Sequence, residues 1–292
     1  MAVLQLKVIL PLCVLVIMGA LLSKMTSLFW NPITHTTEFD TPLPKVLHQV
    51  LDNNIVQNRR VFVVGDIHGC YDELQALLMK ADVLKDDAVV IFAGDLVNKG
   101  PKSTDVLQFI RENTEKYQLY AVRGNHDEKV ILEYSRNKDP SYTLTNKYKW
   151  VTDLTENDID YLSELPYTIS IPSLKSLVVH AGIVPGIPLA KQQPIHMTTM
   201  RNIISLNNNQ FEISKYEKDG VAWGSLWKGP NCIYYGHDAK RGLQEHPFAV
   251  GLDTGCVYGK KLTGVFIHSP GTRRYVSVDA QTVYRAPKDS AR

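Results

Sequence analysis

The chain has 292 residues, of which 44% are hydrophobic and 21% are charged, and its formal net charge is +2. This is an ordinary globular composition, long enough for one large domain and a short extra segment. The net charge selects neither anionic nor neutral partners, so any electrostatic argument has to be local. The four cysteines are too few and too scattered for a disulfide framework, which excludes that class of secreted protein.

Residues 8–22 form an uncharged apolar run with a lysine close to each end. A helix of this length is shorter than the ~30 Å hydrocarbon core of a bilayer, and the flanking lysines can make up the difference. A cleaved signal peptide and a buried core helix are the alternatives. We predict a signal anchor over residues 1–24, a tether rich in Thr and Pro over residues 25–44, and a globular domain over residues 45–292.

The globular domain is expected to open with a short helical stripe formed by Val46, Leu47, Val50 and Leu51. After it, the same sequence of features occurs three times: a β-rich run, a polar turn at a glycine, and a helix. The predicted strands cover residues 61–64, 88–93 and 119–122, and the predicted helices cover residues 71–81, the stretch from 103 onward, and residues 128–134.

Polar side chains that can bind metal follow each of these strands. Asp66 and His68 follow the first, Asp95 the second, and Asn125 the third. An ordinary loop with a capping Asp and a solvent-facing His would explain the first pair alone. Three repeats are typical of an open α/β sheet, which places its site at the carboxyl ends of the strands. Carboxylates and imidazoles gathered at one point favour a transition-metal site.

The second half of the chain has short strands separated by Gly and Pro turns. They are predicted over residues 168–171, 176–179, 232–235, 249–252, 262–268 and 274–278, after a helical insert over residues 144–165. His180 and His237 each close one of these strands. A hydrogen-bonded core histidine would explain either one alone, but with the three earlier clusters metal ligation is the better explanation. Residues 188–220 are predicted to be an excursion of loop and helix.

The motifs GDIHG, GDLVNKG, RGNHD, HAG and GHD, in this order, resemble the calcineurin-like metallophosphoesterase superfamily. The resemblance implies an α/β fold, a four-layer sandwich of two sheets flanked by helices, with two metal ions between the sheets. It assigns six ligands: Asp66 and His68 for the first metal, Asp95 as the bridge, and Asn125, His180 and His237 for the second metal. It also implies that His126 is not a ligand and protonates the leaving-group oxygen.

These residue types suit two divalent cations, with Zn²⁺ favoured and Mn²⁺, Co²⁺ or Fe as alternatives. A pair of such ions lowers the pKa of a shared water for attack on phosphorus. Arg123 is expected to clamp a phosphoryl oxygen, with a surface salt bridge as the alternative, and Asn98 is expected to orient the ring of His126. Further contacts with substrate are expected from four basic residues: Lys99, Arg201, Lys240 and Arg241.

Three positions depart from the GDxVDRG and GNHE motifs of Ser/Thr protein phosphatases, namely Asn98, Lys99 and Asp127. GDLVNKGP, HAGIVPGIPL and GLDTGC instead resemble the ApaH-like phosphatases. That family is related to bacterial dinucleoside tetraphosphate hydrolases, and its fungal members include a vacuolar, zinc-dependent endopolyphosphatase. A basic rim between Trp223 and Arg274, with seven basic residues against three acidic ones, suits a long polyanion. A scatter of solvated lysines is the alternative.

We therefore predict a membrane-anchored phosphohydrolase that cleaves phosphoanhydride bonds, specifically an endopolyphosphatase at the vacuole membrane or in the vacuole lumen. The alternatives are a dinucleoside polyphosphate or mRNA-cap hydrolase and, after them, a Ser/Thr protein phosphatase. A catalytically inactive binding protein is disfavoured because every expected ligand is present. The expected partners are polyphosphate or another phosphoanhydride and a membrane, but not double-stranded nucleic acid.

Overall fold

The computed structural model describes residues 36–206, 210–267 and 273–287, so the predicted anchor over residues 1–24 lies outside the described residues. Within the described part of the chain, no helix is both long and apolar enough to cross a bilayer. The chain divides into two compact units, Met1–Thr36 and Thr37–Arg292. The second unit is the globular domain, and it begins before residue 45: Pro42 O, within the predicted tether, accepts a hydrogen bond from Arg123 Nη1 at 2.9 Å.

The first sheet contains the three repeated strand–turn–helix segments. Its strand order is β14-β13-β2-β3-β4, with β2, β3 and β4 parallel. The strands are β2 (Arg60–Val64), β3 (Ala88–Phe92), β4 (Leu119–Ala121), β13 (Lys261–Ile267) and β14 (Arg273–Asp279). The helices that follow the parallel strands are α3 (Tyr71–Ala81), α4 (Ser103–Tyr117) and α5 (Asn125–Arg136). The predicted βαβαβ arrangement is therefore present, with α5 starting three residues before its predicted first residue.

The second sheet has the order β1-β5-β6-β10-β12-β11 and is mixed. Its strands are β1 (His48–Val50), β5 (Thr168–Ile171), β6 (Ser176–Val179), β10 (Cys232–Tyr235), β11 (Gln244–Glu245) and β12 (Ala249–Gly251). The helical stripe predicted at the start of the domain is wrong. Residues His48–Val50 instead pair in parallel with β5, because that pairing supplies the backbone hydrogen bonds that a single helical turn would have to make alone.

The two sheets pack face to face, and β2 shows how. Val61 and Val63 point into the core between the sheets, where they meet Val178 and Val250 of the second sheet. The alternate residues of β2, including Phe62, point to the other side and pack under α3, α4 and α5. Because both faces of β2 are buried, its sequence is continuously apolar rather than alternating.

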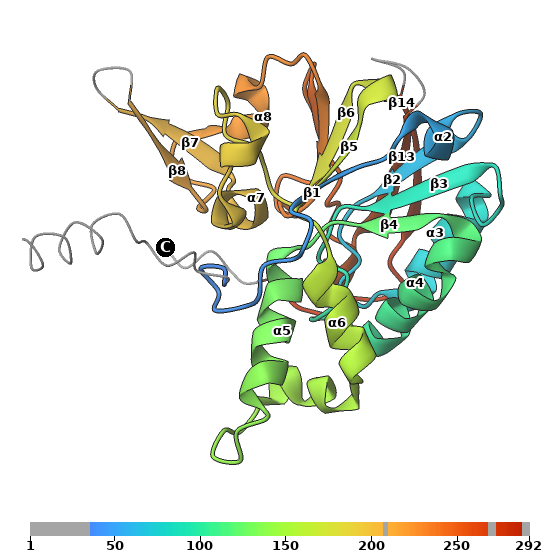
Figure 1. Cartoon of the computed structure of the whole chain (residues 1–292), viewed down its shortest axis with the longest axis vertical. Helices are drawn as coiled ribbons and strands as arrows, with labels where there is room; N and C mark the ends of the chain where they lie inside the picture. Colours follow the sequence, from blue (N-terminus) through green and yellow to red (C-terminus); the bar gives the residue numbers. More distant parts are fainter. Residues whose placement is uncertain (1–35, 207–209, 268–272, 288–292) are drawn as a thin grey trace, which may run out of the picture. The chain divides into compact units, whose positions relative to one another are not determined.

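Different elements cover the two outer faces of the sandwich. On the first sheet lie α3, α4, α5, η1 (Asn146–Asp153) and α6 (Glu156–Glu164), seen on the lower and right side of Figure 1. The outer face of the second sheet is covered by α7 (Pro194–Thr199), α8 (Trp223–Leu226) and a small sheet of β7 (Asn202–Ser205), β8 (Phe211–Ser214) and β9 (Val221–Ala222). The predicted four-layer arrangement thus holds in part, since the predicted excursion over residues 188–220 contains a β-hairpin.

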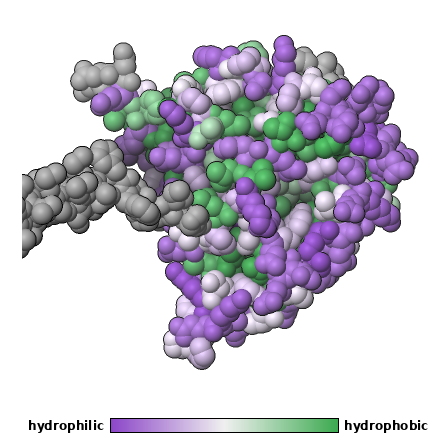
Figure 2. All heavy atoms as spheres, viewed as in Figure 1, coloured by the Kyte–Doolittle hydropathy of each residue, from purple (hydrophilic) through white to green (hydrophobic). Residues whose placement is uncertain are grey.

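The surface of the domain is mixed in character. Figure 2 shows apolar residues in small patches among hydrophilic ones on the face viewed. Exposed large apolar side chains include Val46 and Val50 beside the edge strand β1, and Phe211 on β8. Scattered apolar groups of this kind are ordinary on a globular surface.

Candidate metal centre

The six predicted ligands come together where strands from both sheets end. Asp66, His68, Asp95 and Asn125 follow β2, β3 and β4 of the first sheet, and His180 and His237 follow β6 and β10 of the second. All six side chains are buried, with at most 9% of each residue exposed. The convergence predicted from the strand ends is therefore what the structure has.

Asp95 lies between two groups of ligand atoms. Its Oδ2 is 3.4 Å from His68 Nε2, and its Oδ1 is 3.4 Å from His180 Nε2. Asp66 Oδ2 lies 3.7 Å from the same atom of His68. Asn125 Oδ1 lies 3.2 Å from His180 Nε2. Each oxygen of Asp95 thus faces a different histidine, as a carboxylate shared by two cations must do.

Backbone carbonyls fix which ring nitrogen of each histidine faces the site. His180 Nδ1 lies 2.8 Å from Ala93 O, and His237 Nε2 lies 3.1 Å from Thr199 O. A carbonyl only accepts hydrogen bonds, so each of these nitrogens carries the ring proton. The other nitrogen of each ring is left with a lone pair, which is the form that binds a metal.

The side chains gathered at this centre also have the chemistry needed to hold cations. Asp66 Oδ1 accepts the backbone N–H of His237 at 2.9 Å, while Asp66 Oδ2 is buried and has no hydrogen-bond partner among the described residues. Burial raises the pKa of Asp66, and the nearby carboxylates of Asp253 and Asp95 raise it further. Burial lowers the pKa of His68 to about 3. A buried cluster of carboxylates and neutral imidazoles is stabilised by cations, so the residues fit two divalent ions.

The turns that carry these side chains have an unusual backbone. His68, Asp95, Asn98, Lys99 and His237 all have positive φ, between 50° and 74°. Left-handed conformations of this kind cost about 1–3 kcal/mol each and persist where the surroundings enforce them. These residues of the site are five of the ten non-glycine residues with positive φ in the described part of the chain.

The carboxylate of Asp127 holds these turns in place. It accepts the backbone N–H groups of Asp95, Leu96 and Gly124 at 2.8–3.0 Å. In the sequence, Asp127 is notable only as a departure from the GNHE motif. The motif gives no sign that its carboxylate accepts hydrogen bonds from the turn that carries Asp95.

His126 is oriented by Asn98. Asn98 Oδ1 accepts the N–H of Lys99 at 2.9 Å, so the amide group that faces His126 Nδ1, also at 2.9 Å, is the NH₂ donor. His126 Nδ1 must accept that bond, which leaves the proton of the neutral ring on Nε2. The rings of His126 and His68 meet edge to face, with centroids 5.0 Å apart. His126 is therefore beside the metal centre with Nε2 directed as a hydrogen-bond donor. The proton transfer predicted for it requires the imidazolium form, which burial disfavours by lowering the pKa of His126 well below its ordinary value.

Arg123 does not reach the site, and its predicted role as a phosphoryl clamp disagrees with its burial. The side chain is 0% exposed, and Nη1 lies 3.3 Å from Glu128 Oε1. Nη2 donates to Ser163 O. The ring of Tyr167 stacks under the guanidinium of Arg123, and the Tyr167 hydroxyl donates to Glu128 Oε1 at 2.5 Å. The alternative of an ion pair is confirmed, but the pair is buried rather than on the surface.

The predicted substrate contacts from the second half of the chain are already bound to protein groups. Arg241 Nη1 lies 2.5 Å from Asp238 Oδ2, and Lys240 Nζ lies 3.0 Å from Glu217 Oε2. Arg201 donates to the carbonyl of His237 at 2.9 Å. Of the seven basic residues of the rim, three are paired with carboxylates: Lys240, Arg241 and Lys261. The rim is thus neutralised in part, and two of the partners, Glu217 and Asp279, lie outside the stretch over which its charge was counted.

Two further charged residues lie at the site. Lys99, predicted to contact substrate, has its Nζ 2.7 Å from His68 Nε2, and its contact with substrate stays a prediction. Asp253, which was not predicted, is 4% exposed and raises the pKa of Asp66. Asp253 follows β12 just as Asp95 follows β3, so the rule of polar residues after strands would have found it.

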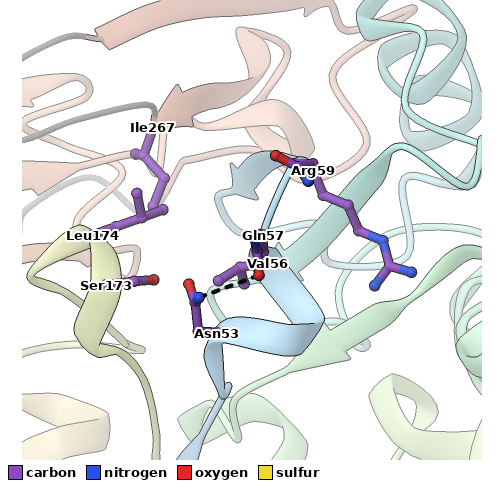
Figure 3. Close-up of a pocket in the computed structure, with 8 residues that line it drawn as sticks. Asn53, Val56, Gln57, Arg59, Ser173, Leu174 and Ile267 are labelled. Atoms are coloured by element: carbon purple, nitrogen blue, oxygen red, sulfur yellow. Dashed lines mark hydrogen bonds between the residues drawn. The ribbon is translucent and has the colours of Figure 1, made fainter.

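A separate pocket of about 260 Å³ lies far from this centre (Figure 3). Ile267, which lines it, pairs with Val61 near the beginning of β2, whereas the metal ligands follow the end of that strand. The lining residues are Asn53, Val56, Gln57, Asn58, Arg59, Ser173, Leu174 and Ile267. None of these eight is a His, Cys, Asp or Glu, so the pocket lacks the side chains that hold transition metals.

Comparison with known proteins agrees with the geometry. Residues 59–262 match the sequence profile described as calcineurin-like phosphoesterase. The chain belongs to this family. The resemblance predicted from the motifs is thereby confirmed at the level of the family.

The relatives that this family member resembles carry names of nucleotide hydrolases. The asymmetrical bis(5'-nucleosyl)-tetraphosphatase PrpE of Bacillus subtilis is 28% identical over 223 residues. The match covers 69% of this chain and 88% of the Bacillus protein. The symmetrical bis(5'-nucleosyl)-tetraphosphatase of Coxiella burnetii is 28% identical over 282 residues, covering 78% and 94%. A solved structure described as a candidate diadenosine tetraphosphatase has a TM-score of 0.69 and 33% identity, covering 80% of this chain and 98% of that one.

A Ser/Thr phosphatase from Saccharomyces cerevisiae, with similarity to human PP5, has a TM-score of 0.55 at 15% identity and covers 84% of this chain and 86% of its own. At that identity the likeness concerns the fold alone.

Proposed function

We propose that the protein is a metal-dependent hydrolase that cleaves a phosphoanhydride bond of a dinucleoside polyphosphate. The observation that carries the proposal is the placement of Asp95, whose two oxygens face His68 and His180 at 3.4 Å each. The names of the relatives favour a dinucleoside substrate over the endopolyphosphatase predicted first. The argument for a long polyanion is also weaker, because three of the seven basic residues of the rim are paired with carboxylates.

The residues of the site would have different roles in such a reaction. Two divalent ions, when bound, would activate water and neutralise charge on the phosphoryl group. Asp66, His68, Asp95, Asn125, His180 and His237 would hold them. His126, in its imidazolium form, would pass its Nε2 proton to the leaving oxygen and return to the neutral ring, and Asn98 holds the ring in place. Lys99 adds a positive charge beside the developing phosphoryl charge.

The predicted membrane anchor and vacuolar location rest on residues 1–24 and on family likeness. They remain predictions, and the proposed activity does not depend on them.

The experiment compares three substrates. The purified protein is incubated with diadenosine tetraphosphate, long-chain polyphosphate and a phosphopeptide, each with Zn²⁺, Mn²⁺, Co²⁺ or Mg²⁺ in turn. We expect the dinucleoside to be hydrolysed fastest, and only with a divalent ion present. Faster hydrolysis of polyphosphate would restore the prediction made from the sequence, and turnover of the phosphopeptide alone would overturn both.

A further inference from the structure

Lys129 is a half-buried lysine without a carboxylate partner near the metal centre. It lies on α5, three residues after His126 and four after Asn125. Residues at these spacings share one face of a helix, and helical side chains tilt toward the N-terminus. The ammonium of Lys129 is therefore directed along α5 toward the end of the helix where His126 stands.

The surroundings of Lys129 are positively charged. Burial lowers the pKa of Lys129, and the cations Lys147, Lys99 and Arg201 lower it too, whereas Asp95 acts in the opposite direction. No ion pair or hydrogen bond joins its ammonium to another residue within the described ranges. Placing a half-buried cation among other cations is unfavourable unless an anion compensates it.

Lys147 reaches the same place from another element. Lys147 Nζ lies 3.0 Å from the hydroxyl of Tyr148 on η1, which packs against α5. The side chain of Tyr148 interacts with that of Asn98, whose amide nitrogen lies 2.9 Å from His126 Nδ1. A short chain of contacts thus connects the ammonium of Lys147 to the proposed proton donor.

We propose that Lys129 and Lys147 form a subsite for the phosphates of the leaving group. This inference rests on the proposed function, because that function places the leaving oxygen next to His126. A leaving group that is itself a nucleoside phosphate carries several negative charges, and two ammonium groups would offset them. The subsite therefore favours phosphoanhydrides over simple phosphate esters.

The test compares a substrate with a phosphorylated leaving group and one without. Lys129→Met and Lys147→Met are measured on diadenosine tetraphosphate and on p-nitrophenyl phosphate, whose leaving group has no phosphate. We expect kcat/KM on the tetraphosphate to fall by about 10-fold or more in each variant, the scale of a lost charge-assisted hydrogen bond. On the ester, kcat/KM should stay within about 2-fold. Lys138→Met is the control, because this lysine has an exposed side chain near the other end of α5.

A second readout does not depend on turnover. Calorimetric titration of metal-loaded Lys129→Met with ATP and with AMP should show weaker binding of ATP than the unaltered protein shows, and unchanged binding of AMP. Equal losses on both substrates, or unchanged kinetics in both variants, would overturn the subsite. If the unaltered protein does not cleave the tetraphosphate, the proposed function fails, and the same comparison with inorganic triphosphate still tests the subsite.

Discussion

At the scale of single residues, the site depends on side chains that are fixed before any substrate arrives. Asp95 Oδ1 accepts the backbone N–H of His126 at 2.7 Å as well as facing His180. The residue that joins the two metal positions therefore also places the proposed proton donor. Preorganised contacts of this kind reduce the reorganisation needed during reaction.

Replacing His126 by Ala should separate chemistry from metal binding. The ring is not one of the six ligands, so both metal positions are retained, while turnover falls by about 100-fold or more for loss of a general acid. Metal content by elemental analysis and kcat on diadenosine tetraphosphate check this. Full activity in His126→Ala would remove the residue from the mechanism.

Arg123 should matter for stability rather than for substrate binding. Arg123→Ala leaves Glu128 buried without its cation, which costs about 3–5 kcal/mol of unfolding free energy when one partner of a buried pair is removed. Urea denaturation measures this loss. The double variant Arg123→Met with Glu128→Gln should recover part of it, because no unpaired charge remains. A changed KM with unchanged stability in Arg123→Ala would restore the predicted clamp.

The convergence of the six candidate ligands could be predicted from the sequence because each follows the end of a strand within about four residues, and strand ends meet at one edge of a sheet. The role of Arg123 could not, although it stands in the same motif as Asn125. Its partners Tyr167 and Ser163 come from a later part of the chain, and only the folded structure shows that they enclose it.

At the scale of elements, the turns after the strands are packed so closely that only glycine fits at some positions. A β-carbon built on Gly236 would lie 1.9 Å from Asp66 Oδ1, and one built on Gly124 would lie 2.3 Å from Asp95 Oδ1. Each glycine precedes a ligand turn of one strand and touches a ligand from another strand. The close approach of different turns is thus what brings their ligands together.

Gly236→Ala should disturb metal binding although it changes no ligand. The added methyl group displaces Asp66, and we expect a loss of about 10- to 100-fold in metal affinity, as for other supporting groups of metal sites. Titration of the metal-free protein with Zn²⁺ measures this. Gly242→Ala is the control: nothing lies within 4 Å of its built β-carbon, so only its positive φ of 67° is penalised, by about 1–2 kcal/mol of stability. Equal metal affinity in both variants would contradict the steric argument.

Elements with a strong local pattern were predicted well, and elements stabilised by distant partners were not. The apolar stripe of α3 and the start of α4 at Ser103 agree with the sequence. β1 and the hairpin of β7 and β8 were missed, because neither has a long run of apolar or alternating residues. β1 depends on pairing with β5, some 120 residues away.

At the scale of the whole molecule, the candidate metal centre joins the two sheets. Three strands of one sheet and two of the other carry the candidate ligands, so bound ions would add to the apolar packing and to hydrogen bonds such as His237 N–H to Asp66 Oδ1 that already link the sheets. Ions that bind the folded state alone stabilise it by about 2.7 kcal/mol per site at 100 times the dissociation constant.

Removal of metal should therefore lower the resistance of the protein to denaturant. We expect the urea midpoint to fall after dialysis against a chelator and to recover on addition of Zn²⁺ or Mn²⁺. Asp95→Asn, which weakens the shared ligand, should show a much smaller difference between the two conditions. An identical midpoint with and without metal would argue against ions bridging the sheets.

The position of β2 has a consequence for biosynthesis. β2 lies between β3 and β13, yet β13 begins only at Lys261, close to the end of the chain. While the ribosome is still making the second half, β2 has one open edge and the later histidines have not yet emerged. The nascent chain therefore exposes one edge of an apolar strand until β13 has been made, and that edge is where a chaperone would shield it.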